Sequence, residues 1–164
     1  MKTLFSSLVV IVFLVCFSDG IQAQTVASTL DQQKLMNLFI GTWHQNVAKD
    51  TIEVWEIHPY GKAFISTESH IIKGNKTPLG MNNVAFSSTL GKFKGFVLYF
   101  NGTTSTWLGA FTSEKKFNLD FARNFDPANV SGKLEFVFNP PDNFTMTRFK
   151  DGVKTGEYKF YRVK

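Results

Sequence analysis

Three histidines are the side chains of this sequence best suited to metal ligation or proton transfer: His44, His58 and His70. No short spacing places two of them on one face of a helix, as metal-binding helices require. A single histidine is sufficient to ligate haem, so that role stays open. The simpler interpretation is that all three lie at the surface or at the ends of strands.

Three glutamates, Glu53, Glu56 and Glu68, are the other candidates for acid–base chemistry. Glycoside hydrolysis needs two opposed carboxyl groups about 5–9 Å apart, and sequence spacing alone does not place them so. The Gly-x-Ser-x-Gly pattern of a serine nucleophile and the glycine-rich phosphate loop are absent from the sequence. We therefore assign no catalytic residue, no metal ligand and no cofactor.

Aromatic side chains carry a stronger signal. Trp55 and Trp107 alternate with polar or small neighbours, which predicts that both face the interior of a β structure. A tryptophan offers a large apolar face and one N–H donor, which suits a ligand pocket better than a dry core. The candidate ligand-binding residues are Trp55, Phe86, Phe96, Trp107, Phe121, Phe136, Met146 and Tyr158.

Small and polar residues interrupt these stretches at positions where a packed core needs bulk. The examples are Gly80, Asn82, Gly95, Gly109 and Ala110. Such gaps beside large rings favour an apolar cavity with a few polar groups that orient a ligand. The alternative is that the rings fill the interior, as side chains do in small barrels.

One helix is expected before the β structure. Thr29 and Gln32 form a capping-box pattern, in which a hydroxyl accepts from the first free amides. Leu35, Leu38 and Phe39 follow at helical spacing, and a glycine ends the run. A helix of about ten residues is marginal by itself, so its apolar stripe must pack on another element.

After Gly41 the chain alternates with period two or is rich in aromatic and β-branched residues. Asn101-Gly102 predicts a two-residue type I′ hairpin turn, because both residue types tolerate positive φ. The segment from Asn124 to Gly132 is the longest break between strands. The expected strands are Thr42–Val47, Thr51–His58, Ala63–Ile72, Leu79–Ser88, Phe93–Phe100, Ser105–Ser113, Phe117–Arg123, Lys133–Asn139, Phe144–Lys150 and Glu157–Val163.

The short connections leave no room for helical crossovers, so the strands are expected to be antiparallel neighbours in up-and-down order. A sheet of about ten strands has two costly edges unless it closes. We therefore predict an all-β antiparallel barrel of about ten strands, preceded by one short helix that covers one end. A two-sheet sandwich is the alternative.

The first residues are typical of an export signal. Lys2 precedes an apolar run from Leu4 to Phe17, and Ala23 supplies a small residue for cleavage. The run is shorter than the roughly 20 apolar residues of a membrane span, although an uncleaved anchor is the alternative. We expect residues 1–23 to be a cleavable signal peptide, residues 24–164 to form a single domain, and the location to be periplasmic or secreted.

Charge and cysteine content narrow the function further. The chain carries a net charge of +5, but its lysines are scattered at turns and form no continuous basic stripe, which argues against nucleic acid as a partner. Cys16 is the only cysteine and lies in the expected signal, so the mature domain has no thiol chemistry and no disulfide.

Three short motifs together resemble the calycin superfamily, which includes lipocalins and fatty-acid-binding proteins. They are Gly41-Thr42-Trp43 at the first strand, Ser105-Thr106-Trp107 in mid-chain, and an aromatic and basic last strand, Tyr158–Val163. The sequence is most similar to a bacterial family of uncharacterised calycin-like domains that begin with Gly-Thr-Trp. It departs from secreted lipocalins in lacking their acidic and aromatic loop motif, and from fatty-acid-binding proteins in lacking two lid helices.

The resemblance implies a structural role for two residues. In calycins a tryptophan packs at the closed end of the barrel, often under an arginine from the last strand. Trp43 and Arg162 match these positions, and cation–π attraction between such groups contributes about 0.5–2 kcal/mol.

Three hypotheses for function remain at this point. The first is a non-catalytic, lipocalin-like carrier or sensor that holds a small apolar molecule in the barrel. The second is a filled barrel that serves as a structural or protein-interaction module. The third is a small calycin-type enzyme, such as an isomerase or hydratase, which requires a buried titratable residue with a shifted pKa in the cavity.

Overall fold

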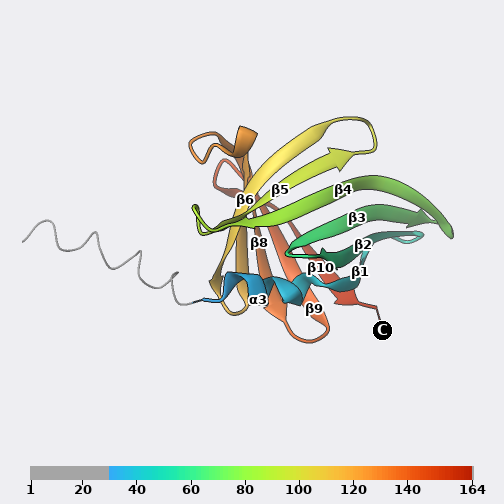
Figure 1. Ribbon diagram of the computed structural model, residues 1–164. Coiled ribbons are helices and arrows are strands. Elements are labelled where there is room, and N and C mark those ends of the chain that lie inside the picture. The colour runs from blue at the N-terminus through green and yellow to red at the C-terminus, as the bar shows by residue number, and fades with distance from the viewer. Residues whose placement is uncertain (1–29, 164) are drawn as a thin grey trace, which may run out of the picture. The chain divides into compact units, whose positions relative to one another are not determined.

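The computed structural model describes residues 30–163, which form a closed antiparallel barrel with the strand order β1-β10-β9-β8-β7-β6-β5-β4-β3-β2 (Figure 1). Every neighbouring pair is sequential in the chain except β1 and β10, which close the barrel. The strands are β1 (Gly41–Ala48), β2 (Thr51–Tyr60), β3 (Ala63–Ile72), β4 (Asn75–Ser87), β5 (Lys92–Tyr99), β6 (Thr104–Ser113), β7 (Lys116–Ala122), β8 (Val130–Asn139), β9 (Asn143–Lys150) and β10 (Val153–Arg162).

Within residues 30–163 the predicted all-β, up-and-down barrel with one preceding helix is confirmed, and the sandwich alternative is wrong. Several strands begin earlier than predicted: β4 at Asn75 rather than Leu79, β8 at Val130 rather than Lys133, and β10 at Val153 rather than Glu157. These additional residues are mostly exposed and polar. They extend the hydrogen-bonded strand pairing beyond the core, where alternation of apolar and polar residues no longer indicates a strand.

The expected two-residue turn at Asn101-Gly102 is wrong. A four-residue connection joins β5 to β6, and Gly102 has a positive φ of 81°, whereas Asn101 does not. A type I′ turn needs positive φ at both central residues. The Asn101 carboxamide instead accepts hydrogen bonds from the backbone N–H and the hydroxyl of Thr103, at 3.0 and 2.7 Å.

The helix is shorter than predicted and begins elsewhere. It consists of α3 (Gln32–Met36), followed by the 3₁₀ turn η2 (Asn37–Phe39), and its N-cap is Asp31, whose carboxylate accepts from the N–H of Lys34. The expected cap, Thr29, lies outside the described residues. Of the predicted apolar stripe, Phe39 is buried, whereas Leu35 and Leu38 are only partly buried. The other buried side chains are Gln32 and Met36, which share an i, i+4, i+7 face with Phe39.

Gln32 attaches this helix to the end of β6. Its Nε2 donates to the carbonyl oxygen of Phe111 at 3.0 Å, and its Oε1 accepts from the Phe111 N–H at 2.8 Å. The buried amide thus imitates a neighbouring strand at the position where β6 has a free backbone pair. Figure 1 shows α3 at the end of the barrel where β8 and β9 meet their loop, and we call this the closed end.

Phenylalanine rings fill the closed end. The ring of Phe39, from η2, meets the rings of Phe117, Phe136 and Phe138 edge-on, with centroids 5.4, 5.3 and 4.6 Å away. Edge-to-face pairs at such distances are favourable beyond their buried area. The helix is therefore held by aromatic packing as well as by Gln32, and this core forms the floor of the space above it.

Residues 1–29 lie outside the described part of the chain, so the expected signal peptide, residues 1–23, stays a prediction. None of the helices in residues 30–163 has the length and apolar character that a membrane crossing requires.

Candidate ligand-binding cavity

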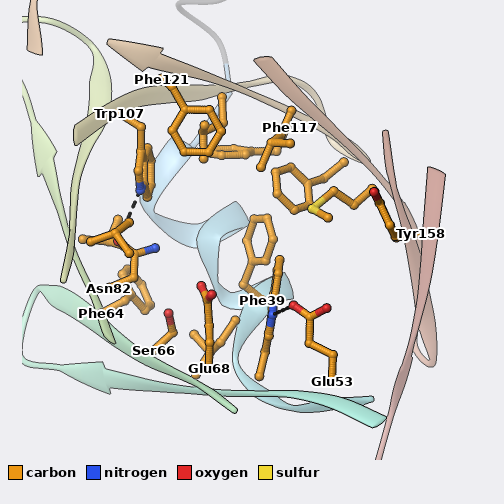
Figure 2. A pocket seen from close by; sticks show the side chains of 18 of the residues that line it. Phe39, Glu53, Phe64, Ser66, Glu68, Asn82, Trp107, Phe117, Phe121 and Tyr158 are labelled. Carbon is orange, nitrogen blue, oxygen red and sulfur yellow. Dashed lines mark hydrogen bonds between the residues drawn. The ribbon is translucent and has the colours of Figure 1, made fainter. Parts of the chain in front are cut away.

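Above the phenylalanine floor the barrel contains a cavity of about 350 Å³. Figure 2 shows side chains from both sides of the barrel directed into this space. The volume lies near the lower end of the range for small-molecule sites, about 300–1,000 Å³. The lining residues are Met36, Phe39, Gln45, Glu53, Trp55, Ile57, Phe64, Ser66, Glu68, Asn82, Val84, Val97, Tyr99, Trp107, Phe117, Leu119, Phe121, Leu134, Phe136, Met146, Arg148 and Tyr158.

Six of the eight sequence-predicted ligand-binding residues line this cavity: Trp55, Trp107, Phe121, Phe136, Met146 and Tyr158. Phe86 is not among the lining residues. It packs on Phe93, with ring centroids 5.1 Å apart.

The prediction that Phe96 lines the cavity is wrong, because this residue lies on the outer surface and is 41% exposed. Its neighbours Gly95 and Val97 are buried, and Val97 lines the cavity. Side chains alternate between the two faces of a strand, so Phe96 must point away from Trp107 and not flank it.

The expectation that Gly95 and Gly109 leave free space is also wrong. A Cβ atom at Gly95 would lie 1.8 Å from the indole of Trp107, and one at Gly109 would lie 2.4 Å from the ring of Phe117. Each glycine therefore makes room for an aromatic ring from the neighbouring strand. The indole of Trp107 is oriented by a 3.2 Å hydrogen bond from its Nε1 to Oδ1 of Asn82.

The side of the cavity formed by β1, β2 and β3 carries the polar residues Gln45, Glu53 and Glu68, none of which the sequence analysis assigns to the ligand site. Gln45 pairs with Glu53 across β1 and β2, and Trp55 pairs with Glu68 across β2 and β3. In Figure 2 the carboxylate of Glu68 points into the cavity, with the ring of Phe121 on the far side. The sequence does indicate one of these residues. Glu53 is two residues from Trp55, so the two side chains lie on the same face of β2, and the prediction that Trp55 faces inward applies to Glu53 as well.

Among residues 30–163, Glu68 is the titratable group whose pKa its surroundings shift most. Burial raises the pKa of the Glu68 carboxyl from its ordinary 4.5 to about 7, and the negative charge of Glu53 adds to this effect. No described residue forms an ion pair or a hydrogen bond with the Glu68 carboxylate. Glu53 differs, because its Oε1 accepts a 2.8 Å hydrogen bond from Nε1 of Trp55.

The third glutamate, Glu56, points to the opposite face. It accepts a 2.6 Å hydrogen bond from Nζ of Lys76 and a 3.2 Å hydrogen bond from the Thr67 hydroxyl. These contacts lower the pKa of the Glu56 carboxyl, chiefly through Lys76. Glu56 and Glu68 thus lie close in the sheet but in opposite environments.

One cationic side chain lines the cavity. Arg148, on β9, is exposed, and its guanidinium lies 5.7 Å from the ring centroid of Tyr158 on β10. The cavity therefore has a polar wall (Gln45, Glu53 and Glu68) and, across from it, an aromatic wall (Trp107, Phe117 and Phe121; Figure 2). It also contains Arg148, which packs against Tyr158.

The histidines do not contribute to this site. His44, His58 and His70 are absent from the lining residues. Among residues 30–163, no group of three or more His, Cys, Asp and Glu side chains is arranged to hold a metal ion.

Trp43 and Arg162 lie together at the closed end, below the cavity. The Arg162 guanidinium carbon is 4.1 Å from the indole centroid, and Trp43 is 1% exposed. Arg162 also donates to the carbonyls of Pro141, Ile40 and Leu38, and the Trp43 Nε1 donates to the carbonyl of Phe39 at 2.7 Å. These contacts join the helix, the first strand and the last strand.

Comparison with protein-family models and with curated proteins found no match to this chain. The closed ten-strand antiparallel barrel is consistent with a calycin-like fold. The functional argument therefore depends on the cavity itself.

Proposed function

We propose that this protein binds one small, mainly apolar molecule inside the barrel and acts as a non-catalytic carrier or sensor. The observation that carries the proposal is the 350 Å³ cavity, in which aromatic side chains face a few polar groups. Ligand sites typically have this composition, with apolar walls for affinity and few polar groups for orientation. The volume favours a compact ligand over a long-chain lipid.

Two further elements belong to the proposal. The protein acts in the periplasm or outside the cell, because residues 1–23 have the composition of a cleavable signal. It belongs among the calycins, because the barrel starts at Gly41-Thr42-Trp43 and an arginine of its last strand covers that tryptophan. N-terminal sequencing of the exported protein tests the first element, with Gln24 as the expected first residue.

A matched pair of variants on β3 tests the binding proposal. Ser66 is buried and lines the cavity, whereas the next residue, Thr67, is exposed on the outer face. Ser66→Phe places a ring inside the cavity, and Thr67→Phe places the same ring outside. Binding is measured by titrating the neutral dye N-phenyl-1-naphthylamine, whose fluorescence rises in apolar surroundings.

We expect saturable binding of one dye per chain in the wild type and in Thr67→Phe, and at least a tenfold loss of affinity in Ser66→Phe. Circular dichroism establishes that each variant is folded. A second cavity-filling variant, Val97→Phe, replaces Ser66→Phe if that chain does not fold. Equal dye binding by folded cavity-filling variants and by Thr67→Phe would contradict the proposal, as would the absence of dye binding by the wild type.

One observation favours catalysis as a second candidate function. The pKa of the Glu68 carboxyl, about 7, is suited to general acid–base chemistry near neutral pH. A small calycin-type enzyme would use this carboxyl to move a proton on a bound isomerisable or hydratable substrate. Such an activity would disappear in Glu68→Gln while the neutral dye still binds.

A further inference from the structure

Hydrogen-bond acceptors without donors gather on the polar wall of the cavity. Gln45 is 8% exposed, lines the cavity, and has a buried Oε1 that accepts no hydrogen bond. A buried acceptor without a partner costs about 1–3 kcal/mol, so native proteins rarely retain one. The Glu68 carboxylate likewise accepts nothing from the described residues.

The three side chains of this wall are cross-strand neighbours. Gln45 is directly opposite Glu53, and Glu68 is opposite Trp55, which shares the inward face of β2 with Glu53. Directly opposite residues have Cβ atoms roughly 4.5–5.5 Å apart, and diagonal ones roughly 7–8 Å. Glu53 therefore lies between Gln45 on β1 and Glu68 on β3, and acceptors from three strands line one wall of the cavity.

The charge of the wall is negative and uncompensated. The four ion pairs of residues 30–163 include neither Glu53 nor Glu68. Both carboxylates nevertheless line the same cavity, and the lining cation, Arg148, is placed against Tyr158. Like charges in a buried site favour a cationic ligand and disfavour an anionic one.

We propose that the ligand carries a protonated amine, which donates hydrogen bonds to Glu68, Glu53 and Gln45 while its apolar body lies against the aromatic wall. This inference rests on the proposed binding function and specifies its ligand class. An ammonium group has three donors, which matches the three acceptors. A hydroxyl has one donor and can pair only one of the two acceptors that lack a donor, Gln45 Oε1 and the Glu68 carboxylate, and a carboxylate brings a third negative charge to the wall.

Three probes with one apolar skeleton test the inference by calorimetric titration: 4-phenylbutylamine, 4-phenylbutan-1-ol and 4-phenylbutanoate. At about pH 8 we expect the amine to bind at least about tenfold more tightly than the alcohol, because charge-assisted hydrogen bonds are roughly twice as strong as neutral ones. The carboxylate is expected to bind least.

Glu68→Gln is the informative variant, because it removes one negative charge and keeps the shape of the side chain. It should bring the amine affinity to within about threefold of the alcohol affinity. Glu56→Gln is the matched control, because Glu56 is on the outer face and pairs with Lys76. It should leave the preference for the amine unchanged.

Proton release gives an independent readout. The other charged or titratable groups that line the cavity are Glu53, Tyr99, Arg148 and Tyr158. Because the pKa of Glu68 is about 7, amine binding near neutral pH should release a proton and should weaken as pH falls. Alcohol binding should do neither.

The outcomes separate the two proposals. Equal affinity for amine and alcohol, or tightest binding of the carboxylate, overturns the inference and leaves the proposed function intact. A preference for the amine that survives Glu68→Gln also overturns it. Failure of all three probes and of the naphthylamine dye contradicts the proposed function itself.

Discussion

Replacing Glu68 by glutamine should stabilise the unliganded protein at alkaline pH. The folded protein holds this carboxyl proton up to about pH 7, whereas the unfolded chain releases it near the ordinary value of 4.5. Between these values the folded state binds more protons than the unfolded state, so the free energy of unfolding falls as pH rises through this window. Above about pH 7 the full cost of the buried carboxylate is present.

The size of this effect follows from the two values. Each tenfold change in a proton equilibrium is worth about 1.4 kcal/mol, so the interval from 4.5 to about 7 corresponds to a cost of about 3 kcal/mol near pH 8. Near pH 5 most of the folded chains carry the proton, and the cost is below about 1 kcal/mol. Glu68→Gln carries no charge at either pH and removes this dependence.

Urea denaturation of the wild type and of Glu68→Gln at both pH values, followed by tryptophan fluorescence, measures the difference. The variant should be more stable by about 3 kcal/mol near pH 8 and by less than about 1 kcal/mol near pH 5. Glu56→Gln is the control with the opposite sign: the Glu56 pKa is lowered by Lys76, so this change should destabilise slightly near pH 8 and less in acid. An equal gain for Glu68→Gln at both pH values, or no gain near pH 8, would refute the reasoning.

Three further changes probe the frame of the cavity. Arg162→Ala removes the guanidinium from the indole of Trp43 and should lower the free energy of unfolding by about 1–3 kcal/mol, with Arg162→Lys intermediate in urea denaturation. Gly95→Ala puts a Cβ where the indole of Trp107 lies, so it should move that ring and shift the fluorescence spectrum; an unshifted spectrum would contradict the close packing. Gln32→Ala removes two buried hydrogen bonds to β6, so it should speed hydrogen exchange in α3 while the exchange rates of the barrel strands stay unchanged.

The barrel could be predicted from the sequence because its signals are local. Short turn segments separate stretches with period-two alternation, and connections this short permit only antiparallel neighbours. The boundaries of the helix could not be predicted as well. Gln32 reads as a capping residue, yet its amide is buried and bonded to Phe111, 79 residues away, and no local pattern reveals a contact of that kind.

The cavity could be predicted only in part. Trp55 and Trp107 were assigned inward from their polar neighbours, and both line the cavity. Phe96 departs from the prediction because an aromatic residue beside a glycine suggests an interior position, whereas Gly95 itself faces inward and accommodates the indole. The sequence marks Glu68 as a candidate for acid–base chemistry but does not place it in the cavity, because an inward carboxylate and a surface carboxylate give the same strand pattern and a register shift follows Glu68 in its pairing with β4.

The central claim, that the barrel holds one small molecule, is tested most directly by native mass spectrometry of the protein isolated from its own cells. The folded chain should carry an additional mass of one small molecule per barrel, which is lost on denaturation and is absent from folded Ser66→Phe. A folded wild-type chain with only its polypeptide mass, both as isolated and after incubation with N-phenyl-1-naphthylamine and the phenylbutyl probes, would contradict the claim.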